Sequence, residues 1–261
     1  MHPASLDDFL HAIPKVEFHC HLFGTVRQST FEALNARARS PLAAEEIRGF
    51  YTRGEKPVGV LRGLRALDAE LVRTPDDLHQ LTYEYLQDAA SHNVRHAEFF
   101  WNPTGTVHES GIAYRAAQDA IVRAIRDAQK DLGIAGRLIA AIDREASPEA
   151  AVEMVDWVLA NRADEVIGIG IDYREVDRPP EMFLEAYRRA RAGGLKTTAH
   201  AGEFGMPWTN VRTAALSLQV DRIDHGYTVV DQPDFARECA ERGLIFTVVP
   251  TNSYYLRTLP P

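Results

Sequence analysis

Two histidines separated by a single residue stand near the start of the chain, within residues 16–22 (VEFHCHL). This stretch predicts a buried strand. Successive strand side chains point to opposite faces, so His19 and His21 share one face. Neutral imidazole is a good zinc ligand, and a divalent cation can bridge two imidazoles on one buried face. We therefore predict that both histidines bind a metal. The alternative is a pair of strand histidines that find hydrogen-bond partners in the core.

A second group of chemically capable residues lies far along the chain. His200 ends a predicted strand and precedes Ala-Gly-Glu, so it is the natural third metal ligand. Water bound to such a metal has a pKa near about 7 and can attack as hydroxide. Glu203, on the following loop, can carry the proton that a leaving group needs, and His225 can accept or orient a proton of the water. Alternatively, Glu203 is a surface carboxylate and His225 a core histidine bonded to a backbone carbonyl.

The elements that must position these residues alternate between strand and helix. Buried strands are predicted at residues 15–21, 94–100, 137–143, 166–172, 195–200, 221–225 and 244–249. The later units recur at roughly thirty residues, a spacing typical of parallel strands joined by helices. Residues 27–92 contain no strong strand before the second one, and we interpret them as a helical insertion, with a possible role as a lid.

Two architectures are compatible with this alternation of strands and helices. A doubly wound nucleotide-binding sheet needs a glycine-rich turn after its first strand, and that turn here holds one glycine, Gly24. A TIM barrel instead places polar functional groups at the carboxyl ends of several strands. The sequence shows that pattern, at His19, His21, Glu98, Asp143, Asp172, His200 and His225. We predict one α/β domain over residues 1–261, a TIM-type (β/α)8 barrel that lacks its eighth strand.

Composition narrows the class of protein. The 261 residues carry a formal net charge of −8 with no basic run, which argues against a nucleic-acid surface. No apolar run is long enough to cross a bilayer, and no secretory signal is visible. Cys20 and Cys239 form no C-x-x-C pair, which fits free thiols in a reducing compartment. We expect a cytoplasmic protein with a small-molecule partner, without contact to nucleic acid or membrane, and leave the oligomeric state open.

Three segments resemble the leading motifs of the adenosine/adenine deaminases, which are zinc amidohydrolases built on a TIM barrel. They are residues 14–25 (PKVEFHCHLFGT), 200–203 (HAGE) and 222–226 (RIDHG). The resemblance implies one zinc per chain, bound by His19, His21 and His200. It also implies that Glu203 protonates purine N1 and that His225 orients the hydrolytic water. Hydroxide would add to C6 of a 6-aminopurine and ammonia would leave, with adenosine as the leading substrate, converted to inosine, and adenine close behind.

The sequence departs from this family pattern at three places. The family's zinc has a carboxylate ligand after the eighth strand, and this sequence stops at Pro261, before such a motif. A barrel that binds metal or purine without catalysing a reaction is therefore the alternative to an enzyme. Phe23 stands where adenosine deaminases carry an acidic residue that contacts ribose. Glu175 stands where they place a glycine against the purine, which resembles the adenine-deaminase branch. Adenine and modified aminopurines are therefore alternative substrates. His21 and Glu175 are candidate substrate contacts, although Glu175 could instead pair with Arg178.

Several other residues receive a structural interpretation. Glu98 and Asp143 could line the pocket, but we favour bonds within the barrel. Phe100 and Trp101 could stack on a purine, although packing is the more common role of such residues. Cys20 points away from the face shared by the two histidines, so we do not expect it to act as a nucleophile.

Overall fold

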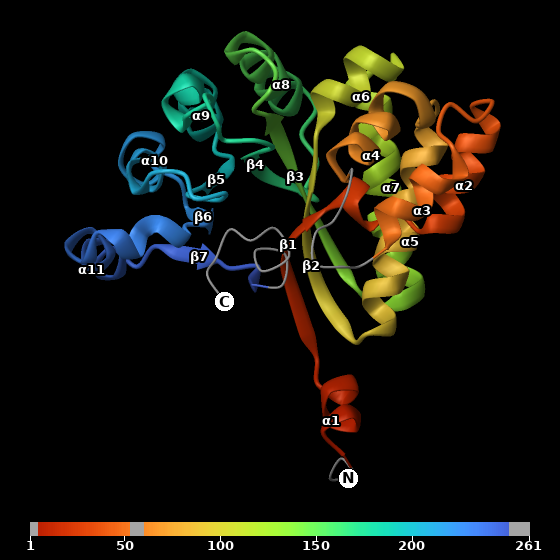
Figure 1. The fold of residues 1–261 in the computed structure, drawn as a ribbon, viewed down its shortest axis with the longest axis horizontal. Helices are drawn as coiled ribbons and strands as arrows, with labels where there is room; N and C mark the ends of the chain where they lie inside the picture. The colour runs from red at the N-terminus through yellow and green to blue at the C-terminus, as the bar shows by residue number, and fades with distance from the viewer. Residues whose placement is uncertain (1–4, 53–59, 251–261) are drawn as a thin grey trace.

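The chain forms a seven-stranded parallel sheet that curls into a nearly closed barrel (Figure 1). The structure is a computed structural model that describes residues 5–52 and 60–250. The strands follow the chain order in space, each paired with the next. They are β1 (Lys15–His21), β2 (Val94–Trp101), β3 (Ala135–Asp143), β4 (Val166–Asp172), β5 (Lys196–Ala201), β6 (Arg222–His225) and β7 (Ile245–Thr247). The predicted barrel class and its seven strands are confirmed, with boundaries that move by two residues at most.

Helices connect the strands and cover the outside of the sheet. The first part of the chain contains α1 (Leu6–Ala12), α2 (Gln28–Arg37), α3 (Ala44–Tyr51), α4 (Val60–Ala66) and α5 (Pro75–Ser91). The later connections contain α6 (Pro103–Ser110), α7 (Tyr114–Leu132), α8 (Pro148–Ala160), α9 (Leu184–Ala192), α10 (Trp208–Thr213) and α11 (Pro233–Glu241). Helices α2–α5 form the expected insertion between β1 and β2, and Figure 1 shows them gathered on one side of the sheet.

The helix boundaries follow from local capping chemistry. Thr74 accepts a hydrogen bond from the N–H of Asp77, whose carboxylate accepts one from the N–H of Thr74, so a capping box starts α5. Ser147 caps α8 because its side chain accepts a hydrogen bond from the N–H of Ala150, and Pro148 lies in the first turn. Gly133 ends α7 with φ 70°, a conformation that costs glycine little.

Helix α6 is the element that the sequence did not predict. The helix ends at Ser110 and is followed by Gly111, which has φ 73°. The α6 segment, PTGTVHES, contains glycine and β-branched residues, which are poor helix formers. Packing explains it: the backbone at Gly105 lies against the Asp68 carboxyl, where an added Cβ would come within 2.5 Å of an oxygen.

The sheet separates two apolar regions. Phe100, Ile139 and Ala141 form a small cluster of their own inside the barrel, distinct from the large cluster between sheet and helices. The barrel's first and last strands approach each other through side chains, because His19 Nδ1 lies 3.1 Å from Thr247 Oγ1. Because all seven strands are parallel, their carboxyl ends lie at one common rim, as in other parallel barrels.

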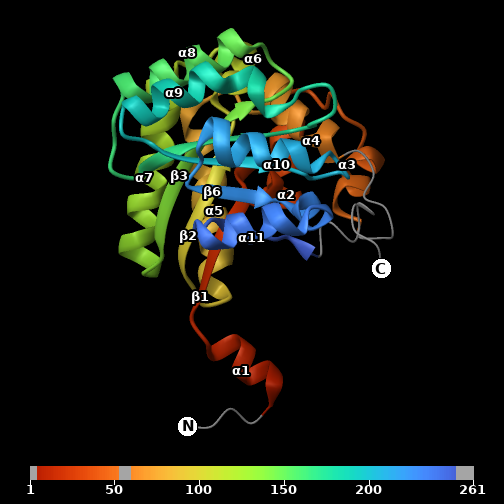
Figure 2. The same cartoon turned by 90° about the vertical axis from the view of Figure 1, so that its left-hand side faces the viewer.

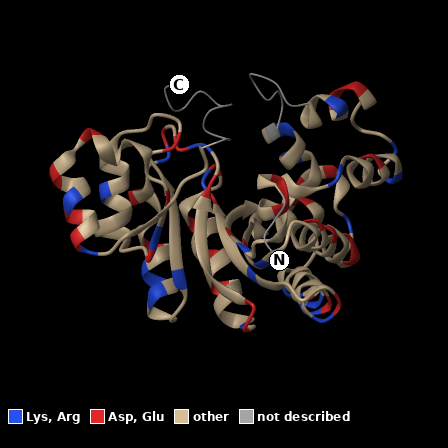
Figure 3. Ribbon diagram, turned by 90° about the horizontal axis from the view of Figure 1, so that it is seen from below, with Lys and Arg blue, Asp and Glu red and all other residues tan. Residues whose placement is uncertain are grey.

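The outer surface carries mixed charge. Figure 3 shows acidic and basic positions interspersed along the helices. Helix α1 projects from the body and buries none of its residues, and Figure 2 shows it standing apart from the barrel. Among the described residues, no helix is both long enough and apolar enough to cross a membrane.

Candidate active site and metal centre

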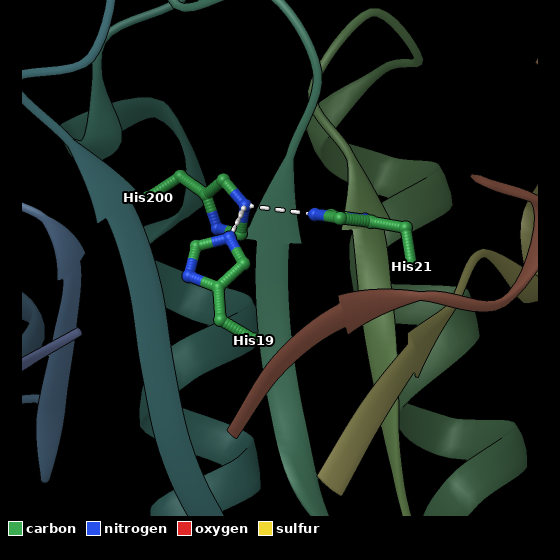
Figure 4. Close-up of side chains that lie close together, drawn as sticks. All are labelled: His19, His21 and His200. Carbon is green, nitrogen blue, oxygen red and sulfur yellow. Dashed lines mark hydrogen bonds between the residues drawn. The ribbon is translucent and has the colours of Figure 1, made fainter. Parts of the chain in front are cut away.

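Three imidazoles from β1 and β5 converge at the carboxyl rim of the barrel (Figure 4). His200 Nε2 lies 3.1 Å from both His19 Nε2 and His21 Nε2. One nitrogen from each ring lies within 4.8 Å of the other two. The β1 pair reaches the same centre because its two members share a face of the strand, as the sequence predicts. The structure therefore brings together the three residues predicted to bind metal.

The donor set fits a zinc ion. Burial lowers the pKa of both His19 and His200, so their rings are neutral near pH 7 and their nitrogens are available as ligands. Three imidazoles without a cation would place their lone pairs or N–H groups against one another. Zinc coordinated by three protein ligands leaves an open position for water, which is the arrangement of a catalytic site. His19, His21 and His200 are thus the residues that would hold the metal.

Glu203 and His225 form a second pair beside the histidine cluster. The Glu203 carboxylate oxygen lies 3.3 Å from His225 Nε2, and the His225 ring centroid lies 4.7 and 4.8 Å from those of His19 and His200. Both side chains are buried. Burial, reinforced by the nearby Glu175 carboxyl, raises the pKa of Glu203 to about 8. Burial and the two neighbouring imidazoles lower the pKa of His225.

This pair therefore holds an unusual distribution of protons near pH 7. The raised pKa of Glu203 and the lowered pKa of His225 both favour the uncharged forms, which is the reverse of an ordinary glutamate–histidine ion pair. Raised carboxyl and lowered imidazole pKa values are typical of groups that exchange protons with a substrate. The two residues predicted for acid–base work are thus placed beside the candidate metal centre, in protonation states suited to it.

The backbone at the end of β6 explains how two consecutive residues reach one site. Asp224 is paired with His200 in the strand register, and both point into the barrel. His225, one residue on, should point outward by strand alternation. It has φ 69°, a left-handed conformation that costs a non-glycine residue on the order of 1–2 kcal/mol. That turn directs the imidazole back over the rim.

Asp224 is the site residue that sequence reasoning missed. Its carboxylate is fully buried and lies 3.4 Å from His200 Nδ1 and 3.7 Å from His19 Nδ1. The hydroxyls of Thr198 and Thr247 donate hydrogen bonds to it at 2.5 and 2.6 Å. Histidine and arginine neighbours lower its pKa despite its burial, so it is an anion. A carboxylate behind ligand histidines fixes their orientation and tautomer. Its inward direction depends on the register of β5 with β6, which no local sequence pattern predicts.

A second carboxylate supports the remaining ligand. Asp172, at the end of β4, lies 3.1 Å from His21 Nδ1, and Asn102 donates a 2.6 Å hydrogen bond to its other oxygen. Phe100 completes the surroundings, since its ring stacks on His21 with centroids 5.0 Å apart and contacts His19 and His200 edge-on. Each of the three imidazoles thus has a fixed partner on the side away from the cluster centre.

Other candidate residues have structural partners. Glu98 accepts a 2.7 Å bond from Arg222 within the barrel, and Trp101 donates to Thr106 at 3.0 Å. Asp143 binds Arg65 of α4 and lines a cavity of about 300 Å³ between α4 and α6. Cys20 contacts Tyr85 on the outer side of β1, where burial raises its pKa to about 12, so it is an unreactive thiol.

The alternative interpretation of Glu175, an ion pair with the Arg178 side chain, does not hold in the structure. The Arg178 guanidinium instead donates to the carbonyls of Ala146 and Glu145, at 3.3 and 3.5 Å. Glu175 is buried and faces Arg144, with 3.7 Å between its Oε1 and Arg144 Nη1. The backbone turns here, with the N–H of Arg178 donating a 3.1 Å bond to the carbonyl of Glu175, and the Glu175 side chain lies in the interior; no sequence pattern predicts that direction.

Comparison with known proteins agrees with this geometry. The family model described as adenosine deaminase matches residues 14–260. The adenine deaminase of Rhodospirillum rubrum is 35% identical over 254 residues, which cover 96% of this chain and 75% of that protein. A crystal structure of an amidohydrolase from Burkholderia ambifaria with bound zinc is 67% identical, with a TM-score of 0.94, over 97% of this chain and 70% of the other. The crystal structure of adenine deaminase from Arthrobacter aurescens is 32% identical, with a TM-score of 0.86, over 95% and 75%.

The family match spans nearly the whole chain, and the motifs that carry it supply the histidine cluster and the Glu203–His225 pair. The chain therefore belongs to the adenosine deaminase family and is a hydrolytic deaminase.

Proposed function

We propose that the protein catalyses the zinc-dependent hydrolytic deamination of a 6-aminopurine, with free adenine preferred to adenosine. The observation that carries the proposal is geometric: the Glu203 carboxylate lies 3.3 Å from His225 Nε2, beside three convergent imidazoles. Two findings favour the free base. Similar proteins that are 32–35% identical are named adenine deaminases. Phe23 also stands where adenosine deaminases place an acidic ribose contact.

The chain's own residues supply the proton transfers. Zinc held by His19, His21 and His200 would polarise a water molecule for attack on purine C6. Glu203 donates its proton to ring nitrogen N1, which makes the adjacent C6 more electrophilic. His225 is neutral and accepts a proton from the attacking water. That proton then passes to the amino group, which leaves as ammonia. The hydroxyl left at C6 returns its proton to Glu203, so the product carries a carbonyl oxygen at C6 and Glu203 is again protonated.

The access side of the site is set by His21. Its side chain is 32% exposed, whereas those of His19 and His200 are 9% and 5% exposed. A planar substrate would therefore approach over the His21 ring, and we propose His21 as a substrate contact as well as a metal ligand. Glu175 was the other candidate contact, and its role is developed below.

The test is a panel of purines incubated with zinc-loaded protein. Adenine, adenosine, AMP and N6-methyladenine are followed by ultraviolet spectroscopy and by ammonia release. We expect ammonia from adenine with a kcat/KM at least tenfold above that for adenosine, and loss of activity after chelation. Ammonia from none of the compounds, with one zinc bound, would instead support a non-catalytic metal- or purine-binding barrel. Faster turnover of adenosine would overturn the preference for the free base.

The cellular setting follows from the same proposal. A purine base or nucleoside is the small-molecule partner that the site would take. Cys20 and Cys239 are both unpaired, which supports the reducing conditions of the cytoplasm as the place of action.

A further inference from the structure

A buried ion pair lies directly beneath the loop that carries Glu203. Arg144 follows the last residue of β3, and Glu175 lies in the loop after β4. Their side chains are 0% and 2% exposed, and Arg144 Nη1 is 3.7 Å from Glu175 Oε1. Neither residue belongs to the histidine cluster. Removing two charges from water costs several kcal/mol, and a buried pair is often no more stabilising than apolar residues of the same size. Stability alone is therefore a poor explanation of this pair.

The two charges hold opposite ends of one short segment, residues 200–203. Arg144 Nη2 donates a 2.5 Å hydrogen bond to the carbonyl of His200. Glu175 Oε1 accepts a 3.1 Å bond from the N–H of Gly202, and the N–H of Glu203 also faces this carboxylate. Asn210 of α10 donates to the same oxygen at 2.7 Å. The segment between the metal ligand and the proton donor is thus bound at its first residue and at its last two.

Gly202 shows how tightly that segment is packed. It has φ 70°, and a Cβ added there would come within 2.5 Å of Thr228 Oγ1 and 2.8 Å of Val211 Cγ2. The backbone therefore approaches α10 and the loop after β6 on one side. On the other side it meets the Arg144–Glu175 pair. The direction in which the Glu203 side chain leaves the loop is set between these two surfaces.

We propose that Arg144 and Glu175 are positioning residues that act through the backbone of residues 200–203 to hold Glu203 against the reacting purine. The inference rests on the proposed deamination and deepens it. Acid catalysis needs the donor within hydrogen-bond reach of the substrate nitrogen, and a displacement of about 1 Å can cost on the order of a hundredfold in rate. The pair keeps that reach without itself touching the substrate.

A direct contact between Glu175 and the purine is the competing role. The geometry favours positioning because Glu175 Oε1 is already taken by a backbone N–H and by Asn210. Its Oε2 is buried and has no hydrogen-bond partner among the described residues. The two roles differ in kinetics: losing a substrate contact raises KM, whereas misplacing the proton donor lowers kcat.

The experiment compares Glu175→Gln with Asp221→Asn. The control is matched because Asp221 also accepts a bond from a backbone N–H of β5, that of Thr197 at 2.9 Å, but at the opposite end of the strand. Three quantities are measured for each full-length variant: zinc content, kcat and KM for the best aminopurine, and amide hydrogen–deuterium exchange of the peptide containing Gly202. Asn210→Ala, which removes only the neutral donor to the same oxygen, is the second variant if Glu175→Gln does not fold.

For Glu175→Gln we expect kcat to fall about ten- to a hundredfold, KM to change less than twofold, zinc to be retained, and exchange at residues 200–205 to accelerate. Asn210→Ala should show a smaller fall in kcat and a smaller acceleration of exchange. Asp221→Asn should change neither kcat nor the exchange of residues 200–205. A tenfold rise in KM with unchanged exchange would overturn the proposal in favour of substrate contact, and unchanged kcat would overturn it outright. If the wild type deaminates no aminopurine, the proposed function fails. The exchange measurement still decides whether the pair holds the segment.

Discussion

Replacing Glu203 by glutamine should strongly lower turnover and yet stabilise the protein at alkaline pH. The carboxyl is buried, and its pKa is raised from 4.5 to about 8. The folded state therefore binds one proton more than the unfolded state between these pH values, so the stability of the wild type falls as pH rises across that window. Glutamine resembles the protonated acid in shape and can still donate to His225, but it never ionises.

The size of the stability gain follows from the shift in the pKa of Glu203. One pKa unit corresponds to about 1.4 kcal/mol, so the stability gained by Glu203→Gln should grow from near zero at pH 4.5 to on the order of 5 kcal/mol above pH 8. Loss of a positioned general acid should at the same time lower kcat about 10²- to 10⁴-fold.

Urea denaturation of zinc-free protein at several pH values, together with ammonia release by zinc-loaded protein, measures both effects. Glu241→Gln, an exposed substitution of the same chemistry at the end of α11, is the control. A variant that keeps its turnover refutes the role of Glu203 as proton donor. A stability difference that does not change with pH refutes the buried protonated carboxyl.

Further predictions concern the residues that orient the candidate metal ligands and Glu203. Asp224→Asn should weaken zinc binding about ten- to a hundredfold in a chelator competition, because Asp224 orients two ligand imidazoles, whereas Asp221→Asn should not. Gly202→Ala should destabilise the protein by about 1–3 kcal/mol more than Gly205→Ala in thermal unfolding, since both have φ 70° but only Gly202 would meet Thr228. If Glu203 is the acid, kcat/KM should fall as pH rises through the pKa of Glu203, because the deprotonated carboxylate cannot donate. Bound zinc would lower that pKa from about 8. A fall in kcat/KM at alkaline pH that persists in Glu203→Gln would contradict this assignment.

The sequence was sufficient for the barrel because its signals were local. Runs such as residues 138–142 are apolar without alternation, and caps such as Ser147 mark the helices that separate them. The three candidate ligands were also visible, because His19 and His21 share a face and His200 ends a strand. Helix α6 escaped prediction because packing against Asp68, and not helix propensity, stabilises it.

The supports of the site were harder to predict because they depend on long-range geometry. Asp224 points inward only through its register with His200, and His225 points there only because its φ is 69°. Glu175 finds Arg144, 31 positions away, rather than Arg178 three positions away, since the loop turns the carboxyl into the core. Strand periodicity gives the face of a side chain, but it does not give its partner on another strand.

X-ray diffraction from crystals of the zinc-loaded protein, recorded above and below the zinc absorption edge, tests the metal centre most directly. We expect one anomalous peak per chain, enclosed by His19 Nε2, His21 Nε2 and His200 Nε2. A zinc ion bound elsewhere, or an empty centre between the three imidazoles in protein that retains deaminase activity, would contradict this expectation.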